Sequence, residues 1–187
     1  MILGGGMLPI EPLMTEHRLI ERLITLMEKE GARIKNDKLT DIDFIDNCID
    51  FIKTYADNCH HGKEEDILFK ELKNKKLIPE HFKILEELIK EHKYARERTS
   101  KLIVARNNYF KSEDDASKQI YAFEIHEYIE EFIDFYPKHI KKEDKEFFRP
   151  CMDYFTDDEK KEMLDLFWEF DRKLIHKKYK KIIESYE

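Results

Sequence analysis

The stretch CHHGKEEDILF, residues 59–69, and its counterpart HIKKEDKEFF, residues 139–148, decide how this chain folds. Each holds a histidine followed four residues later by a glutamate: His61 with Glu65, and His139 with Glu143. On an α-helix this spacing places an imidazole and a carboxylate on one face, one turn apart. Imidazole and carboxylate together suit iron or another borderline transition metal. The repeated motif therefore predicts a metal site between helices.

The composition favours long helices packed in one domain. The chain has 187 residues, of which 41% are hydrophobic and 40% charged, with only 5 Gly and 5 Pro. That is too few turn-forming residues for a β-sandwich or barrel, so an all-α fold is expected. The net charge of −7 argues against a nucleic-acid partner.

The cysteines and the apolar runs bear on where the protein works. Its 3 cysteines, Cys48, Cys59 and Cys151, form no CxxC motif, which is typical of a reducing compartment. No apolar run approaches membrane-spanning length, and the start of the chain lacks the basic region of a signal peptide. We expect a cytoplasmic protein with no membrane contact, whose residues 1–9 form a flexible leader.

Polar breaks divide the remaining chain into five predicted helices, at about 12–30, 40–73, 79–110, 117–148 and from 156 to the C-terminus. Gly31 is expected to end the first helix and Thr40 to cap the second. Pro79 starts the third, and Thr156 with Glu159 makes a capping box for the last. A single domain over 10–187 is predicted, with a metal-binding bundle at about 10–150 and an extra helix at about 156–185.

Four histidines fall on the apolar faces of four different predicted helices: His17, His61, His92 and His139. The second helix is irregular, because the apolar face of its first half lies almost opposite His61. Either the helix is kinked or rewound near Gly62, or its first half packs against another element such as the last helix.

The motif by itself is common here. Glu occupies 25 of 187 positions, so about one His-x-x-x-Glu is expected by chance among 8 His, and five occur. His60 with Glu64 has the same spacing as His61 with Glu65 and stays an alternative ligand pair. His126 is rotated away from His139 and is expected to be structural. Two buried carboxylates without counter-charge would be costly, which favours bound cations.

The order of the motifs resembles the hemerythrin-like HHE cation-binding family. The segments that carry the resemblance are EHRLIERL around His17, CHHGKEEDILF around His61, KEHKYARE around His92 and HIKKEDKEFF around His139. They cover roughly residues 10–150. The resemblance implies an up-down four-helix bundle around two iron ions, a non-haem di-iron centre with an oxo or hydroxo bridge; another divalent metal is an alternative.

Carried over by position, the resemblance implies terminal ligands at His17, His61, His92 and His139, with Glu65 and Glu143 bridging the metals. Oxygen carriers of this kind have a further histidine where Arg96 stands here. They also use a carboxylate at the place of Asp144, which is therefore an alternative to Glu143. Fewer ligands leave open positions for exogenous ligands.

The expected function is binding of, or reaction with, a small ligand such as dioxygen, nitric oxide or peroxide. Nothing in the motifs separates an enzyme from a sensor that acts through a protein partner. Arg96, Tyr128 and Tyr136 are candidates for supporting the metal ligands from outside. The alternative is a helical scaffold with a structural metal, whose last helix docks a partner or a second copy through Phe167, Trp168, Phe170, Leu174 and Ile175.

Overall fold

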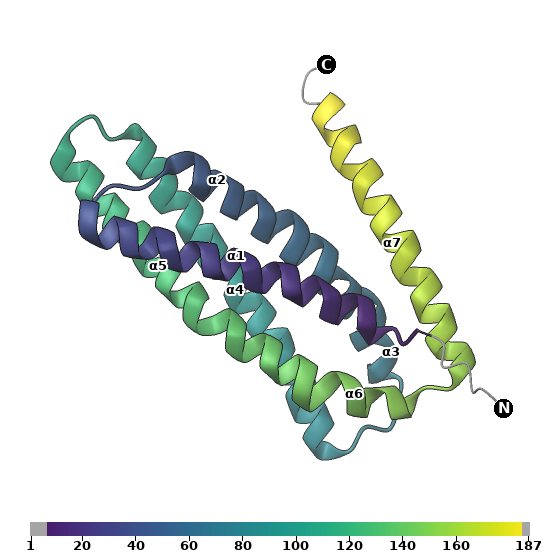
Figure 1. Ribbon diagram of the computed structural model, residues 1–187. Helices are drawn as coiled ribbons and strands as arrows, with labels where there is room; N and C mark the ends of the chain where they lie inside the picture. Colours follow the sequence, from purple (N-terminus) through teal and green to yellow (C-terminus); the bar gives the residue numbers. More distant parts are fainter. Residues whose placement is uncertain (1–6, 185–187) are drawn as a thin grey trace.

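The computed structural model describes the backbone of residues 7–184 and the side chains of residues 7–174, and all regular structure in that range is helical. Four long helical rods run alongside one another (Figure 1). The rods are α1 (Ile10–Asp37); α2 (Ile42–Phe51) with η1 (Ile52–His61), η2 (Glu64–Phe69) and α3 (Lys70–Lys73); α4 (Pro79–Lys111); and α5 (Asp115–Lys141) with η3 (Lys142–Phe147) and α6 (Phe148–Cys151). The short η4 (Met152–Tyr154) leads to α7 (Asp157–Glu184). The prediction of an all-helical chain is confirmed.

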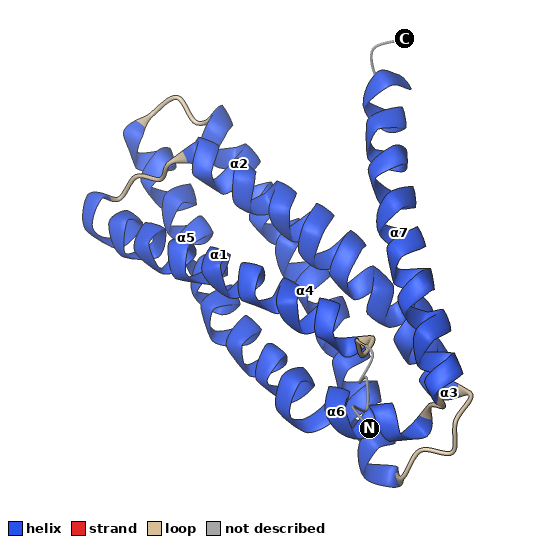
Figure 2. Cartoon of the chain, turned by 45° about the vertical axis from the view of Figure 1, so that its right-hand side comes forward, coloured by secondary structure: helices blue, strands red, loops and turns tan. Residues whose placement is uncertain are grey.

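Short loops separate the rods (Figure 2), and several predicted helix ends are confirmed. Pro79 begins α4 as expected. The capping box forms before α7: the backbone N–H of Glu159 donates to Thr156 Oγ1 at 3.3 Å, and the N–H of Thr156 donates to Glu159 Oε2 at 2.8 Å. The N–H of Ser117 donates to Asp114 at 2.8 Å, so Asp114 caps α5.

Two predicted boundaries are wrong. Gly31 does not end α1, which continues to Asp37 and closes at Lys38 with a φ of 57°. A β-carbon on Gly31 would lie 3.1 Å from Glu130 Oε1, so glycine serves the close approach of α1 to α5 there. Thr40 does not cap the second rod, because its hydroxyl donates to Glu30 Oε1; Asp41 accepts from the N–H of Phe44 and caps α2 instead.

The second rod is rewound, as one of the two expectations for it proposed. Two π-helical segments, η1 and η2, replace regular α-helix on both sides of Gly62. Their i→i+5 hydrogen bonds widen the turn and reduce the angle between successive side chains. The apolar face of the first half packs into the main core through Ile45, Cys48 and Ile52, rather than being reserved for the last helix.

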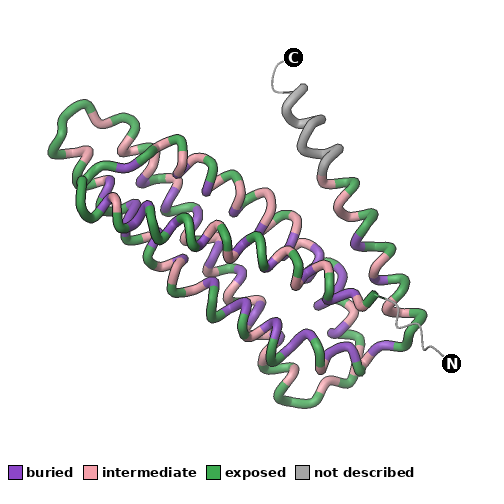
Figure 3. The backbone as a smooth tube through the Cα atoms, in the orientation of Figure 1, coloured by how far each residue is buried: buried purple, intermediate pink, exposed green. Residues whose placement is uncertain are grey.

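The hydrophobic core has two separate parts. One cluster contains Ile20, Ile24 and Met27 of α1 with their partners from the other rods; the other contains Ile10 and Leu13 of α1, also with partners from the other rods. His17 lies between these two sets along α1, and each other rod also buries polar residues: His60, His61 and Glu64 on the second, His92 on the third, and His139 with Glu143 on the fourth. Buried positions recur along all four rods (Figure 3). The fold thus leaves a buried polar layer between two apolar ones.

The ends of the chain are only partly described. Residues 1–6 of the predicted leader lie outside the described residues, whereas Leu8 packs against the second cluster. At the other end, Phe167 is buried, Phe170 packs against the same cluster and Trp168 is 56% exposed. The side chain of Ile175 lies outside the described range. Within that range, no helix combines the length and apolar character that crossing a membrane requires.

Candidate metal centre

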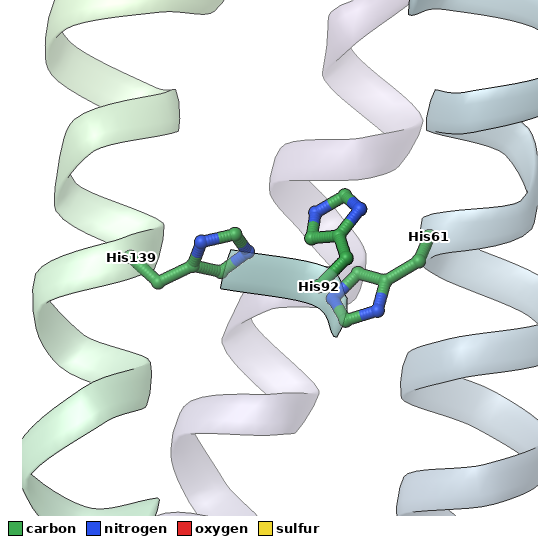
Figure 4. Close-up of side chains that lie close together, drawn as sticks. All are labelled: His61, His92 and His139. Carbon is green, nitrogen blue, oxygen red and sulfur yellow. The ribbon is translucent and has the colours of Figure 1, made fainter. Parts of the chain in front are cut away.

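The buried polar layer consists of five histidines and two glutamates, which we call the ligand cluster: His17 of α1, His60 and His61 of η1, Glu64 of η2, His92 of α4, His139 of α5 and Glu143 of η3. Every member is between 0 and 2% exposed. All four rods contribute, and Figure 4 shows His61, His92 and His139 converging from three of them. Residues far apart in sequence therefore meet at one level of the bundle.

The cluster divides into two groups. His17, His60, Glu64 and Glu143 each offer one ligand atom, and these atoms lie within 4.8 Å of one another; His61, His92 and His139 form a second such group. Each group could therefore hold one metal ion.

The two carboxylates face both groups. Glu143 places Oε2 3.1 Å from His17 Nε2 and Oε1 3.4 Å from His139 Nε2. Glu64 places Oε1 3.4 Å from His60 Nε2 and Oε2 3.4 Å from His92 Nε2. A carboxylate with one oxygen towards each group is arranged to bridge two cations.

The inward-facing atoms of the cluster have no hydrogen-bond partner. They are the Nε2 atoms of the five histidines and both carboxylate oxygens of Glu64 and of Glu143, all of them buried. Leaving a buried polar group unsatisfied costs about 1–3 kcal/mol, and more when the group is charged. Nine such atoms at one place are exceptional, and a pair of cations would satisfy all of them.

On the outer side, each imidazole faces a carboxylate. The Nδ1 atoms of four of them lie 2.7–2.9 Å from a carboxylate oxygen, in the pairs His17–Asp144, His60–Glu16, His92–Glu65 and His139–Glu91. His61 Nδ1 lies farther from its carboxylate, 3.5 Å from Asp57 Oδ1. A proton held on Nδ1 by a carboxylate leaves the lone pair on Nε2, which is the form that binds a metal.

Basic side chains in turn contact these five carboxylates. Arg18 pairs with Asp144, Lys63 with Glu16 and Lys142 with Glu91. Arg96 serves two of them, with Nε 2.7 Å from Asp57 and Nη2 2.8 Å from Glu65. Four basic side chains therefore offset most of the negative charge of the five outer carboxylates, whereas Glu64 and Glu143 have no basic side chain of this kind beside them in the described part of the chain.

Burial and neighbouring charges pull the pKa values inside the cluster apart. Burial, reinforced by the charge of Glu143, raises the pKa of Glu64 well above its usual range. Glu143 is equally buried, yet His139 and His17 hold its pKa well below that range. Burial and the neighbouring His92 lower the pKa of His61 to about 3. Despite its burial, Asp144 and Glu143 raise the pKa of His17 to about 9. These opposite shifts in adjacent groups show that the charges inside the cluster depend on one another.

The structure brings most of the expected ligands together and adds two. His17, His61, His92, His139 and Glu143 all lie in the cluster, and so do His60 and Glu64, the alternative pair of the same spacing. The wide turn of η1 lets the adjacent His60 and His61 both face inward. Arg96 contributes no atom to the ligand cluster. The fifth imidazole of the cluster is that of His60.

Several other candidates lie outside the cluster. Glu65 is directed away from it, towards His92 Nδ1 and Arg96, with its side chain 29% exposed. Asp144 faces His17 Nδ1 and Arg18. His126 lies by Glu130 at 3.8 Å, and Tyr128 packs against the apolar core.

Comparison with known families places these observations in one class. The model of the hemerythrin HHE cation-binding domain matches residues 8–175 of this chain. The chain therefore belongs to the hemerythrin HHE cation-binding family. Searches of the curated proteins and of the solved structures give no significant match.

The last helix covers one side of the cluster through a buried lysine. The Lys63 side chain is 0% exposed, and its Nζ contacts Glu16, the partner of His60, and lies 3.0 Å from Asp171 Oδ1 of α7. The adjacent Gly62 lies beneath Phe170 of α7, whose Cζ would be 2.6 Å from a β-carbon at that position. The helix α7 is thus joined to the segment that bears His60 and His61.

Replacing Lys63 with methionine is expected to lower the free energy of unfolding by about 3 kcal/mol, because Glu16 and Asp171 would lose their shared counter-ion in a buried place. Urea unfolding followed by circular dichroism would measure the change. Lys70→Met is the matched control, because Lys70 is exposed on the same rod. Equal stability of the two variants would contradict a structural role for the buried ammonium group.

Proposed function

We propose that this protein holds a di-iron centre in the ligand cluster, within an up-down four-helix bundle. The first ion is held by His17 and His60 and the second by His61, His92 and His139, with Glu64 and Glu143 shared by both. The proposal is carried by nine buried nitrogen and oxygen atoms that lie close together without a hydrogen bond. Mixed imidazole and carboxylate donors around two adjacent ions suit iron better than a lone tetrahedral zinc.

We propose further that the centre binds or reacts with a small ligand such as dioxygen, nitric oxide or peroxide. The two ions would have four and five protein donors, fewer than the six positions of an octahedral ion. A bound iron pair would supply one-electron redox chemistry and open positions for such a ligand. The chain supplies rigid, oriented imidazoles, a shared pair of carboxylates and a water-poor core.

A purely structural metal is the competing reading, and two features argue against it. The apolar clusters on either side of the polar layer provide a core without any metal. A pocket also reaches His61 from the surface, which a structural ion would not require.

We retain a cytoplasmic location as part of the proposal, since Cys48, Cys59 and Cys151 are all free thiols.

Metal analysis and Mössbauer spectra after aerobic iron loading test the proposal. We expect about two irons per chain, in keeping with a dinuclear carboxylate site in a bundle core. Substituting His61 with alanine should remove one of them, whereas His126→Ala should keep both because His126 lies outside the ligand cluster. A folded, iron-loaded sample without bound metal would overturn the proposal.

The outer carboxylates should tune iron affinity without binding iron. Replacing Glu91 with glutamine removes the charged acceptor of His139 Nδ1, so iron affinity should fall about 10- to 100-fold. Glu87→Gln is the matched control, because Glu87 contacts the same Lys142 at 3.2 Å but no histidine. Competition with a chelator of known affinity measures both variants. Equal losses would show that only the surface charge matters.

A further inference from the structure

A small pocket connects the surface with the ligand cluster beside His61. Its volume is about 130 Å³, and it lies between η1, α4 and α5. Its outer lining includes the exposed Lys53 and Ser100, and its inner lining includes the buried Ala95, His61 and Tyr136. Of the five cluster imidazoles, His61 is the one that lines this pocket.

Two unpartnered polar atoms mark the inner part of the pocket. The hydroxyl group of Tyr136 is buried without a hydrogen-bond partner, and the residue is 1% exposed. His61 Nδ1 also has no hydrogen bond, because Arg96 Nε holds Asp57 at 2.7 Å while His61 lies 3.5 Å from it. Thr99, in contrast, uses its hydroxyl on the carbonyl of Ala95. Buried hydroxyl groups are normally hydrogen-bonded, so the Tyr136 hydroxyl is free to donate to a molecule that enters the pocket.

We propose that this pocket is the path by which the small ligand reaches the ion held by His61, His92 and His139, and that Tyr136 donates a hydrogen bond to that ligand. The inference rests on the proposed di-iron centre. The size limits the ligand: an apolar cavity of about 150 Å³ binds benzene or xenon, so this pocket suits a diatomic molecule, peroxide or azide. The wall combines the apolar Ile52, Ala95 and Ile103 with the charged Lys53, Asp57 and Arg96, so it accommodates a small neutral molecule or a small anion.

The Asp57–Arg96 ion pair lies at the margin of the pocket. Arg96 is 41% exposed at its side chain, and it also binds Glu65, which holds His92. One guanidinium group therefore contacts both carboxylates that face the imidazoles of His61 and His92. The Arg96 side chain therefore lies at the margin of the proposed ligand path.

Filling the pocket tests the path. Ala95→Leu should slow association of azide with the iron-loaded protein at least about tenfold while the iron content stays unchanged, because the added branch occupies the inner pocket. Ala116→Leu is the matched control, since Ala116 is exposed at the start of α5. Stopped-flow absorption measures the rates. Unchanged azide kinetics in Ala95→Leu with both irons bound would overturn the path and leave the di-iron centre intact.

The role of Tyr136 has its own test. Tyr136→Phe should weaken equilibrium azide binding by about 2- to 10-fold, the usual range for one lost hydrogen bond. Tyr128→Phe on the same helix should change nothing, because Tyr128 packs against the core and does not line the pocket. Equal affinities of wild type and Tyr136→Phe would remove the proposed donor.

A measurement on the metal-free protein separates the pocket from the metal. Xenon should bind the wild-type pocket and shift its ¹²⁹Xe resonance, and Ala95→Leu should abolish that shift, because small apolar cavities bind xenon. Absence of iron binding by wild type would refute the proposed function and, with it, this inference. Xenon binding that Ala95→Leu leaves unchanged would refute the pocket alone.

Discussion

Replacing Glu64 with alanine is expected to abolish the proposed di-iron centre, with less than about one iron retained per chain, because a carboxylate that bridges two ions in such a bundle would serve both of them. Its two oxygens face His60 on one side and His92 on the other, at 3.4 Å each. Metal analysis after iron loading and desalting measures the loss. Circular dichroism would establish that the variant is folded, which we expect since Glu64 lies between two intact apolar clusters.

The neighbouring Glu65→Ala variant is the matched control for this prediction. Glu65 has the same spacing from His61 as Glu64 has from His60, but its carboxylate binds His92 Nδ1 and Arg96. Its removal should leave both irons bound with affinity about 10- to 100-fold lower. The opposite result, iron lost in Glu65→Ala and kept in Glu64→Ala, would contradict this assignment. The second rod would then turn Glu65 towards the metal, as regular α-helical winding predicts, and the π-helical winding would be wrong.

Removing the metal should lower the thermal midpoint by about 10 °C or more. A ligand at about 1,000 times its Kd adds about 4.1 kcal/mol, and each kcal/mol shifts the midpoint of a chain of this size by about 2–4 °C. Scanning calorimetry of apo and iron-loaded protein measures the difference. The apo protein should stay helical at 25 °C, because the apolar clusters on both sides of the polar layer remain.

Two outcomes would count against this view. Iron that stabilised Glu64→Ala as much as wild type would show that the stabilising site lies elsewhere. Loss of helix at 25 °C on chelation would favour a structural metal, since the protein would then depend on the ion for its fold, as small zinc domains do.

The helices and most of the cluster were accessible from the sequence, because apolar periodicity reports which face of a regular helix is buried. His17, His92 and His139 lie on such regular segments, α1, α4 and α5. Apolar periodicity is misleading in η1, where the winding changes. A rotation of 100° per residue separates His60 from His61 and favours one of them, whereas η1 places both inward. Two signals in the sequence point to His60. It is adjacent to His61, and its spacing to Glu64 equals that of His61 to Glu65.

Other features depend on tertiary contacts that no local pattern reveals. Glu16 meets His60 across 44 residues, and Glu91 meets His139 across 48. Likewise, the sequence around Gly31 resembles a helix end. The reason for a glycine there is the close approach of Glu130 from another rod, which no local pattern shows. Local spacing predicts which residues share a face, but it cannot predict which side chain of a neighbouring helix will complete their hydrogen bonds.

Because the ligand cluster is distributed over all four rods, it can form only late in the synthesis of the chain. Its first member is residue 17 and its last is residue 143, so no fragment that lacks the fourth rod contains the complete cluster. On a growing chain, Glu143 emerges only after the other members have been synthesised. The complete ligand cluster can therefore form only once all four rods are present, so a cation that requires every member of it would bind after the fourth rod has joined the others.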